Sequence, residues 1–345
     1  MKLSTICDII LDEASSSEIL RAALDNWVHL CSEVTQVYPN PSFDAWAEDS
    51  LLAQGVAINP EAAALCALDY IRSVAFIRGI YAAVNAFRLK TLGRPIEILY
   101  AGCGPYGTLV LPLLHKFTAG ELKLYMLDVH QSSLDSVTCL LNHFELTAHA
   151  VKPIRADACH YQHLGVLDLV IAETMQKSLE QEPQFAVTAN LAAQLSDDAV
   201  FIPQSIEVVL CLANLRKEKS FMKGPSNGQN PAYKREELAT LCTLTAQTAR
   251  AQMSLIKAHR GAEPLAVFKT TIVIPELADD ADFDAVLCTR ICVFQQYSLN
   301  DYDSQITLPQ QCYELSSLQS GDQYHVSYTT GGYPKFNFDK LAASV

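Results

Sequence analysis

Residues 96–107, which spell IEILYAGCGPYG, decide the fold of this chain. A short apolar run leads into a turn that contains three glycines, Gly102, Gly104 and Gly107. Such a run favours a buried strand, and glycines at its carboxyl end allow a tight turn and a close approach of ligand to backbone. Open α/β sheets bind their ligands at this edge. The stretch therefore predicts a ligand-binding turn after the first strand of a parallel sheet.

Strands and helices alternate on both sides of this turn as far as residue 212. The apolar run 167–172 is interrupted only by Asp168, as expected for a strand that is buried on both faces. Strands that alternate with helices of this length predict βαβ units and a parallel sheet. The expected strands are 96–100, 122–127, 148–155, 167–172 and 205–212, and the expected helices are 108–117, 132–144 and 185–195.

Other patterns flank this region. Residues 1–92 have apolar positions at three- and four-residue spacing, which predicts helices, with a break at 38–42 and a new helix start at Asn59-Pro60-Glu61. Residues 214–235 combine a charge run with Gly, Pro and Ser, which predicts an exposed connection. The segment 236–257 that follows is expected to be mostly helical.

The last part of the chain favours strands. Residues 265–338 are rich in Val, Ile, Thr, Tyr and Phe with turn residues between short runs, so an antiparallel β domain is expected. The stretch 331–334, GGYP, is predicted to be a turn, with a place for Tyr333 near a substrate mouth as the alternative.

The net charge limits the classes of binding partner, and the cysteines indicate the redox environment. The net charge is −13, which disfavours nonspecific binding to nucleic acid and to anionic membranes, because phosphate groups attract Lys and Arg. The 11 cysteines form no CxxC pair and lie in apolar runs, so free thiols in a reducing cytoplasm are expected. No signal peptide and no apolar stretch of membrane-spanning length is found.

Acidic residues follow the other predicted strands. Asp128 ends the second strand, where a carboxylate can accept both ribose hydroxyls, and Asp157 follows the third, where it can lie beside an adenine amino group. Glu173 ends the fourth strand beside the ligand. A glycine turn with one acid does not separate a dinucleotide site from a nucleoside site. Pro105 disturbs the entry into a phosphate-capping helix, and together with Asp157 and Glu173 it favours S-adenosylmethionine.

At this point the chain resembles a known family. It is similar to the class I S-adenosylmethionine-dependent methyltransferases, and among them to the protein arginine methyltransferases, over about residues 65–335. The segment Asp69-Tyr70-Ile71-Arg72 resembles the helix that closes over the cofactor, in which the arginine pairs with the methionine carboxylate. Glu173 and Glu182, nine residues apart, resemble the glutamate pair that clamps the substrate guanidinium.

The chain also departs from the family pattern. Tyr100 occupies a position where many relatives have an acid, and no Thr-His-Trp tripeptide occurs in the β region. Both departures leave the acceptor open between a peptide arginine and a small guanidine or amine.

The resemblance implies a Rossmann-like sheet with an N-terminal helical segment and a C-terminal antiparallel β domain. The expected parts are a helical region at 1–92, an S-adenosylmethionine-binding domain at 93–212, a connection with a helix at 213–264 and a β-rich substrate-side domain at 265–345. Glu173 and Glu182 are the expected catalytic residues, and no metal site is predicted. The expected cofactor-binding residues are Arg72, Ala101, Gly102, Cys103, Gly104, Gly107, Asp128, Asp157, Ala158 and Glu173.

The function expected from these residues is N-methyl transfer to a cationic small molecule or peptide. Two alternatives remain open, namely an NAD-dependent oxidoreductase and a non-catalytic binding module on the same scaffold. A homodimer is left open as well.

Overall fold

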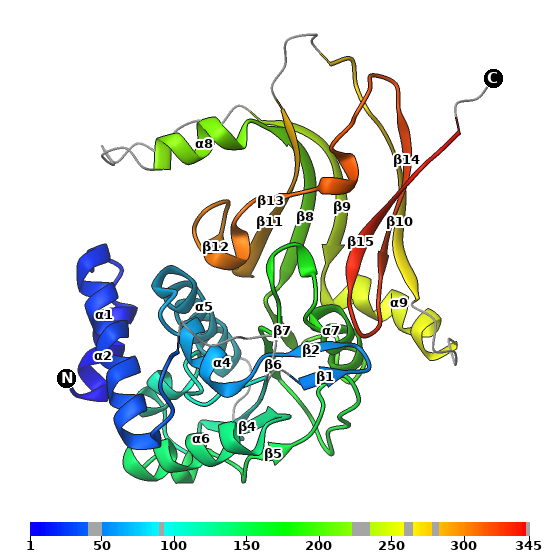
Figure 1. Ribbon diagram of the computed structural model, residues 1–345. Coiled ribbons are helices and arrows are strands. Elements are labelled where there is room, and N and C mark those ends of the chain that lie inside the picture. Colours follow the sequence, from blue (N-terminus) through cyan, green and yellow to red (C-terminus); the bar gives the residue numbers. More distant parts are fainter. Residues whose placement is uncertain (41–49, 90–92, 223–234, 259–264, 278–282, 343–345) are drawn as a thin grey trace.

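The computed structural model describes residues 1–40, 50–89, 93–222, 235–258, 265–277 and 283–342. A parallel sheet with helices on both faces forms the lower part of the molecule, and antiparallel strands stand above it (Figure 1). The fold class expected from the sequence is therefore confirmed. Among the described helices, none is long and apolar enough to cross a membrane.

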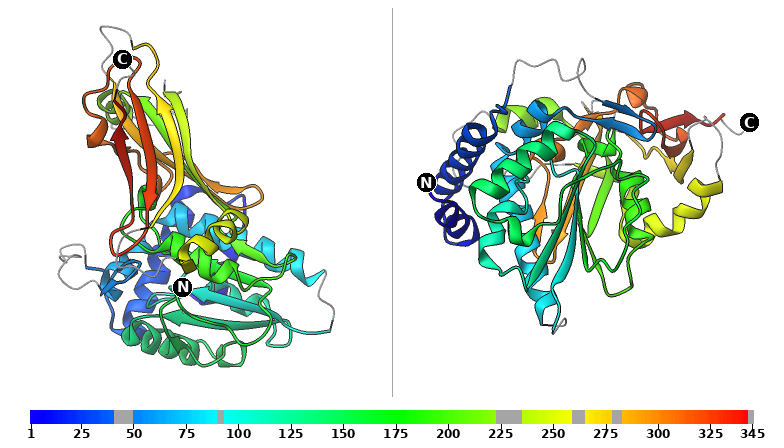
Figure 2. Two further views of the ribbon diagram at one scale, coloured as in Figure 1. Left: turned by 90° about the vertical axis from the view of Figure 1, so that its right-hand side faces the viewer. Right: turned by 90° about the horizontal axis from the view of Figure 1, so that it is seen from below.

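The parallel sheet has the strand order β5-β4-β3-β6-β7, with β3 in the centre. Along β3, Ile98 and Tyr100 point into a core shared with the N-terminal helices, and Leu99 and Ala101 point into a second core beneath α7. The two faces are therefore buried by different helices, which Figure 2 shows on either side of the sheet. The strands are β3 (Ile96–Ala101), β4 (Leu122–Asp128), β5 (Ile154–Arg155), β6 (Leu169–Ala172) and β7 (Val200–Ile202).

One polar residue in the apolar run of β6 has a structural explanation. Asp168 lies just before the strand and accepts two hydrogen bonds from Arg94, at 2.6 and 2.7 Å, and one from the backbone N–H of Glu97. The carboxylate is therefore fully paired at the amino end of the sheet, away from the ligand edge.

Helices and one short hairpin precede the sheet in the described part of the chain. The expected helix start is confirmed, because Asn59 Oδ1 accepts a hydrogen bond from Ala62 N at 3.0 Å and Pro60 lies in the first turn. Part of the predicted break, 41–42, and the end of the second helical stretch, 90–92, lie outside the described residues. The elements are α1 (Leu3–Leu11), α2 (Ser17–Thr35), β1 (Ser50–Leu52), β2 (Gly55–Ala57), α4 (Pro60–Cys66) and α5 (Tyr70–Arg88).

Two elements within the sheet region were predicted too long. The expected helix at 108–117 is a short 3₁₀ helix, η1 (Leu111–Lys116), because residues 109–114 are all buried and have no polar face of helical period. The expected strand at 148–155 is reduced to β5, because Pro153 has no N–H to donate to a neighbouring strand. The helices α6 (Gln131–His143) and α7 (Gln184–Ala192) lie where the sequence predicts them.

Two further predictions are wrong in a connected way. The strand at 205–212, expected in the parallel sheet, is β8 (Ser205–Ala213) and pairs antiparallel with β11 and β9. Residues 236–244, expected to be helical, form β9 (Glu236–Leu244), and the helix α9 (Ala246–Ala258) begins after it. Pairing with β8 outweighs the local helical pattern. We therefore propose to place the boundary between the two domains near Gln204.

The antiparallel region consists of two sheets. One has the order β12-β11-β8-β9 with β13 on β11, and the other has the order β10-β14-β15. The β-rich part expected from 265 onward is thus completed by two earlier strands. Its own strands are β10 (Ala266–Val273), β11 (Asp284–Phe294), β12 (Tyr297–Leu299), β13 (Gln310–Gln311), β14 (Gln323–Thr329) and β15 (Lys335–Lys340).

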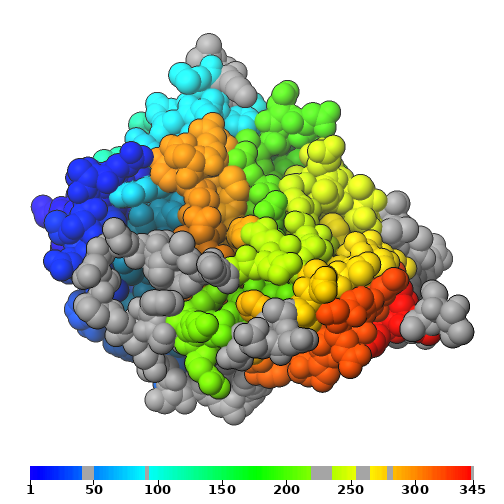
Figure 3. Space-filling view, turned by 90° about the horizontal axis from the view of Figure 1, so that it is seen from above, coloured from blue at the N-terminus to red at the C-terminus, as the bar shows by residue number. Residues whose placement is uncertain are grey.

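The helix α5 packs between the parallel sheet and the antiparallel region. It packs against β11 and β12, and in the view from above the orange residues of this part of the chain lie beside the blue and cyan N-terminal helices (Figure 3). A Cβ atom on Gly79 of α5 would lie only 2.7 Å from Val293 Cγ1 of β11. The close contact between helix and strand therefore requires glycine at this position.

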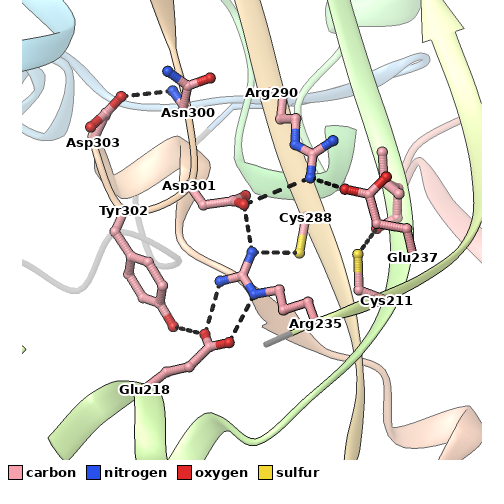
Figure 4. A network of polar contacts seen from close by, with 11 residues as sticks. Cys211, Glu218, Arg235, Glu237, Cys288, Arg290, Asn300, Asp301, Tyr302 and Asp303 are labelled. Atoms are coloured by element: carbon pink, nitrogen blue, oxygen red, sulfur yellow. Dashed lines mark hydrogen bonds and ion pairs between the residues drawn. The ribbon is translucent and has the colours of Figure 1, made fainter. Parts of the chain in front are cut away.

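A buried ionic network holds α8 (Leu215–Met222) on the antiparallel sheet (Figure 4). Glu218 of α8 accepts two hydrogen bonds from Arg235, both at 2.8 Å, and a third from the hydroxyl of Tyr302. Arg235 also donates to Asp301 and to Cys288 Sγ. The expectation that 214–235 is an exposed connection is therefore wrong at its described ends, where the side chains of Glu218 and Arg235 are buried. Residues 223–234 lie outside the described residues.

Replacing Arg235 by methionine is expected to lower the free energy of unfolding by about 3–5 kcal/mol, because Glu218 and Asp301 would keep their charges without a buried cation. Urea denaturation followed by circular dichroism measures this. The variant Arg216→Met, which changes an exposed arginine of α8, the helix that carries Glu218, is the control and is expected to stay within about 0.5 kcal/mol of the wild type. A loss below about 1 kcal/mol for Arg235→Met would contradict the role of the network.

Candidate active site

A cleft lies at the carboxyl ends of β3, β4 and β6, beneath the β1–β2 hairpin. Its empty volume is about 1020 Å³, including the part that is open to solvent. Nine of the expected catalytic and cofactor-binding residues line it: Arg72, Gly102, Cys103, Gly104, Asp128, Asp157, Ala158, Glu173 and Glu182. Ala101 and Gly107 do not, because the first ends β3 inside the core and the second lies in the turn behind the cleft.

The glycine turn is shaped by its neighbours. Gly102 has φ +68°, and a Cβ atom there would lie 2.5 Å from Thr174 Cγ2. Gly107 has φ +54°, and its Cβ would lie 2.6 Å from Leu111 Cδ1. Both positions combine a left-handed backbone with a close contact, which only glycine allows without strain. The turn thus exposes backbone to the cleft, as the sequence predicts.

Asp128 supports this turn as well as lining the cleft. Its Oδ2 accepts a hydrogen bond from Gly104 N and its Oδ1 accepts one from His130 N, both at 2.9 Å. Each carboxylate oxygen has a second lone pair, so the group retains acceptor capacity toward the cleft. Asp128 is 8% exposed.

His130 connects Asp128 to the hairpin that covers the cleft. Its Nδ1 lies 3.4 Å from Asp128 Oδ1, and its Nε2 lies 3.0 Å from the hydroxyl of Ser50 in β1. Sequence analysis missed this contact. Ser50 precedes His130 by 80 residues, and nothing in the local pattern of either residue indicates the other.

Asp157 and Ala158 lie at the third strand end, as expected. One carboxylate oxygen of Asp157 accepts a hydrogen bond from Cys159 N at 2.8 Å and closes a local turn. This turn fixes the backbone of Ala158, which faces the cleft beside Val129 and Ala156. The segment therefore offers one acid and a fixed main chain.

A buried ion pair occupies the other end of the cleft. Arg72 Nη2 lies 3.3 Å from Glu173 Oε2, and the two side chains are 9% and 7% exposed. In the part of the chain that the structure describes, Arg72 Nε has no hydrogen-bond partner although it is buried. A buried donor without a partner is costly, so this atom could donate to an acceptor on a bound ligand.

Asp69 positions Arg72. It is the N-cap residue of α5, and its Oδ2 accepts hydrogen bonds from Ser304 Oγ at 2.6 Å and from Gln305 N at 2.9 Å. The start of the helix is therefore tied to the loop that follows β12. The antiparallel region thereby helps to place the guanidinium in the cleft.

The protonation of the pair follows from its surroundings. Burial raises the pKa of the Glu173 carboxyl to about 7, against the opposing effect of Arg72. Burial also works to lower the pKa of Arg72, but Glu173 and its other neighbours raise it, so the guanidinium stays charged. Tyr100 is buried beside the pair, and burial raises its pKa well above the ordinary value. The tyrosine therefore adds no charge.

Glu182 lines the same cleft and is 8% exposed, so the structure brings the two glutamates of the predicted pair to one cavity. The loop between them is strained, because Ser178, Leu179 and Gln181 have φ values of 59°, 57° and 66°. Such a backbone persists only where the surrounding structure holds it.

The loop is held at its base and by the antiparallel region. Gln184, which is fully buried, accepts a hydrogen bond from Thr174 N at 2.8 Å and donates one to Ala172 O at 3.0 Å, so it joins the two ends of the loop. From above, Thr289 Oγ1 accepts from Ser178 N, and the hydroxyl of Tyr328 donates to Leu179 O. Sequence analysis missed Gln184, although its position two residues after Glu182 is a local signal.

Comparison with known proteins finds no matching family model and no matching curated protein. Similar solved structures include a protein arginine methyltransferase 1 enzyme–prozyme heterotetramer with AdoHcy from Trypanosoma brucei. It has 12% sequence identity and a TM-score of 0.47, over 80% of this chain and 92% of that chain. Protein arginine methyltransferase 10 from Arabidopsis thaliana, in an open conformation, has 14% identity and a TM-score of 0.47, over 75% of this chain and 84% of that chain.

Proposed function

We propose that the protein is an S-adenosylmethionine-dependent methyltransferase that methylates a nitrogen of a cationic guanidine or amine. The observation that carries the proposal is the buried Arg72–Glu173 pair in one cleft with Glu182. An unpaired buried N–H of Arg72 suits a ligand carboxylate, and two acids in the same cavity suit a second, cationic ligand. AdoHcy, which is bound in the trypanosomal structure, is the product of such a reaction.

The residues of the cleft fit the parts of this cofactor. Arg72 would hold the amino-acid carboxylate, the backbone of Gly102–Gly104 would lie beneath the ligand, and Asp128 would accept from ribose hydroxyls. Asp157 and the main chain at Ala158 would face the adenine. The cofactor supplies a methyl group on a positively charged sulfur.

The glutamates would prepare the acceptor. Glu173 and Glu182 would orient a guanidinium through charge-assisted hydrogen bonds and draw its positive charge toward themselves, which leaves electron density on the attacking nitrogen. Alignment is the main requirement of an in-line displacement, so the fixed position of both side chains matters more than acid catalysis. The nitrogen loses one proton as it gains the methyl group, and Glu173, with a pKa of about 7, suits its acceptance.

Cofactor binding is testable without knowledge of the acceptor. Calorimetry is expected to show binding of S-adenosylhomocysteine and no binding of NAD. In Arg72→Met the Kd is expected to rise about tenfold or more, because a charge-assisted hydrogen bond is lost. Arg88→Met is the control, since Arg88 lies on the same helix and pairs with Glu121 outside the cleft. Binding of NAD, or an unchanged Kd in Arg72→Met, would argue against the proposed site.

The acceptor site is tested by charge-neutral variants. Glu173→Gln and Glu182→Gln are each expected to lower kcat/KM for methylation of small guanidines or arginine peptides about 100-fold to 1000-fold, because the variants no longer stabilise the positive charge. Transfer of a labelled methyl group from S-adenosylmethionine measures this. Glu236→Gln, on the exposed edge of β9, is the control. Full activity in Glu173→Gln would exclude the clamp.

The reaction should depend on pH through Glu173. Below a pKa of about 7 this carboxyl is protonated and neutral in the free protein, so kcat/KM is expected to rise as the pH increases from about 5.5 to 8. The rising limb should disappear in Glu173→Gln and persist, at a lower level, in Glu182→Gln. An unchanged limb in Glu173→Gln would assign the titration to another group.

A further inference from the structure

The segment that carries Glu182 is contacted by two elements that come from distant parts of the sequence. One is the β1–β2 hairpin at residues 50–57, and the other is the turn between β14 and β15 at residues 330–334. Figure 1 shows this turn reaching down from the antiparallel region to the hairpin. A Cβ atom on Gly332 would lie 3.7 Å from Leu52 O, so the two elements are also in contact with each other.

Both elements bind the main chain of Gln181, the residue before Glu182. Its carbonyl accepts a hydrogen bond from Val56 N at 2.8 Å, and its N–H donates to Pro334 O at 2.9 Å. Its side-chain amide donates to the hydroxyl of Tyr333 at 3.0 Å. Gln181 has φ +66°, an unfavourable conformation for this residue type, and these contacts hold it there.

Within the hairpin, Gly55 lies closest to the main chain around Glu182. A Cβ atom at this position would lie 2.8 Å from Gln181 O, 2.8 Å from Pro183 N and 3.0 Å from the carbonyl carbon of Glu182. All three are backbone atoms, so a side chain at residue 55 cannot be accommodated by rotation of a neighbouring side chain. The peptide units on both sides of Glu182 would have to move.

We propose that Gly55 and Tyr333 are positioning residues for the methyl acceptor, because the hairpin and the β14–β15 turn together set the position of the Glu182 carboxylate. The inference rests on the proposed function for the role of Glu182 itself. The contacts of Gln181 do not depend on that function. Neither Gly55 nor Tyr333 touches the reacting atoms in this view, and both act through Gln181.

The first test replaces Gly55 by alanine. A displacement of Glu182 by about 1 Å is expected to lower kcat for a guanidine acceptor about 100-fold. The Kd of S-adenosylhomocysteine is expected to change less than about threefold, because Arg72, Asp128 and the glycine turn stay in place. Gly321→Ala is the matched control. Gly321 has φ +84° and no atom within 4 Å of its Cβ position, so alanine adds backbone strain there without a collision.

The second test removes one hydroxyl. Tyr333→Phe loses the contact with Gln181 and is expected to lower kcat about threefold to tenfold, the effect of one neutral hydrogen bond. Tyr313→Phe changes a more exposed tyrosine of the same region and should leave kcat unchanged. If Tyr333 had only a structural role, Tyr333→Phe would lower the melting temperature without lowering kcat at a temperature where the variant is folded.

Hydrogen exchange of the amides at 176–182 gives a readout that needs no turnover. Exchange is expected to accelerate about tenfold or more in Gly55→Ala and to stay unchanged in Gly321→Ala. If the wild type is active and Gly55→Ala retains kcat within threefold, the positioning role is wrong and the proposed function stands. If the wild type methylates no guanidine or amine but exchange accelerates in Gly55→Ala alone, the proposed function fails. The inference that the hairpin holds the main chain of Gln181 in place then stands.

Discussion

The pairing of β3 with both of its neighbours is the constraint on which the site depends. Ala101 pairs with Leu127 of β4 on one side and with Ala172 of β6 on the other. Because the three strands are parallel, the next residues after these three, Gly102, Asp128 and Glu173, lie together at one edge of the sheet. A shift of one residue in either register would move an acid out of the cleft, since successive side chains point to opposite faces.

Burial of the charges at this edge costs free energy. Arg72 and Glu173 are almost fully buried, and the attraction within such a pair only roughly offsets the loss of hydration. The unpaired Nε of Arg72 and the raised pKa of Glu173 are two signs of that cost. A ligand that brings a carboxylate to Arg72 and a cation to the glutamates would relieve both, which supports the proposal that the cleft takes such a pair.

The antiparallel region holds two parts of the site in place. It holds Asp69 through Ser304 and Gln305, and it holds the strained loop through Thr289 and Tyr328. Each residue with a left-handed backbone costs roughly 1–2 kcal/mol, so the three in this loop require several outside contacts. The same strand, β11, contributes Thr289 to the loop and Cys288 and Arg290 to the network around Arg235, because neighbouring residues of a strand face opposite ways.

Local sequence determined the elements whose signal lies in a few neighbouring residues. The apolar run 96–101 with its glycines, the acids that follow the strands, and the resemblance carried by Arg72, Glu173 and Glu182 together predicted nine of the residues that line the cleft. Long-range pairing decided the rest. The segment 236–244 is a strand because β8 lies beside it. β8 itself, which the sequence placed in the parallel sheet, pairs in the antiparallel one. The contacts of Ser50 with His130 and of Gly55 with Gln181 join residues 80 and 126 positions apart, and no local pattern encodes such a distance, because only the packed chain brings them together.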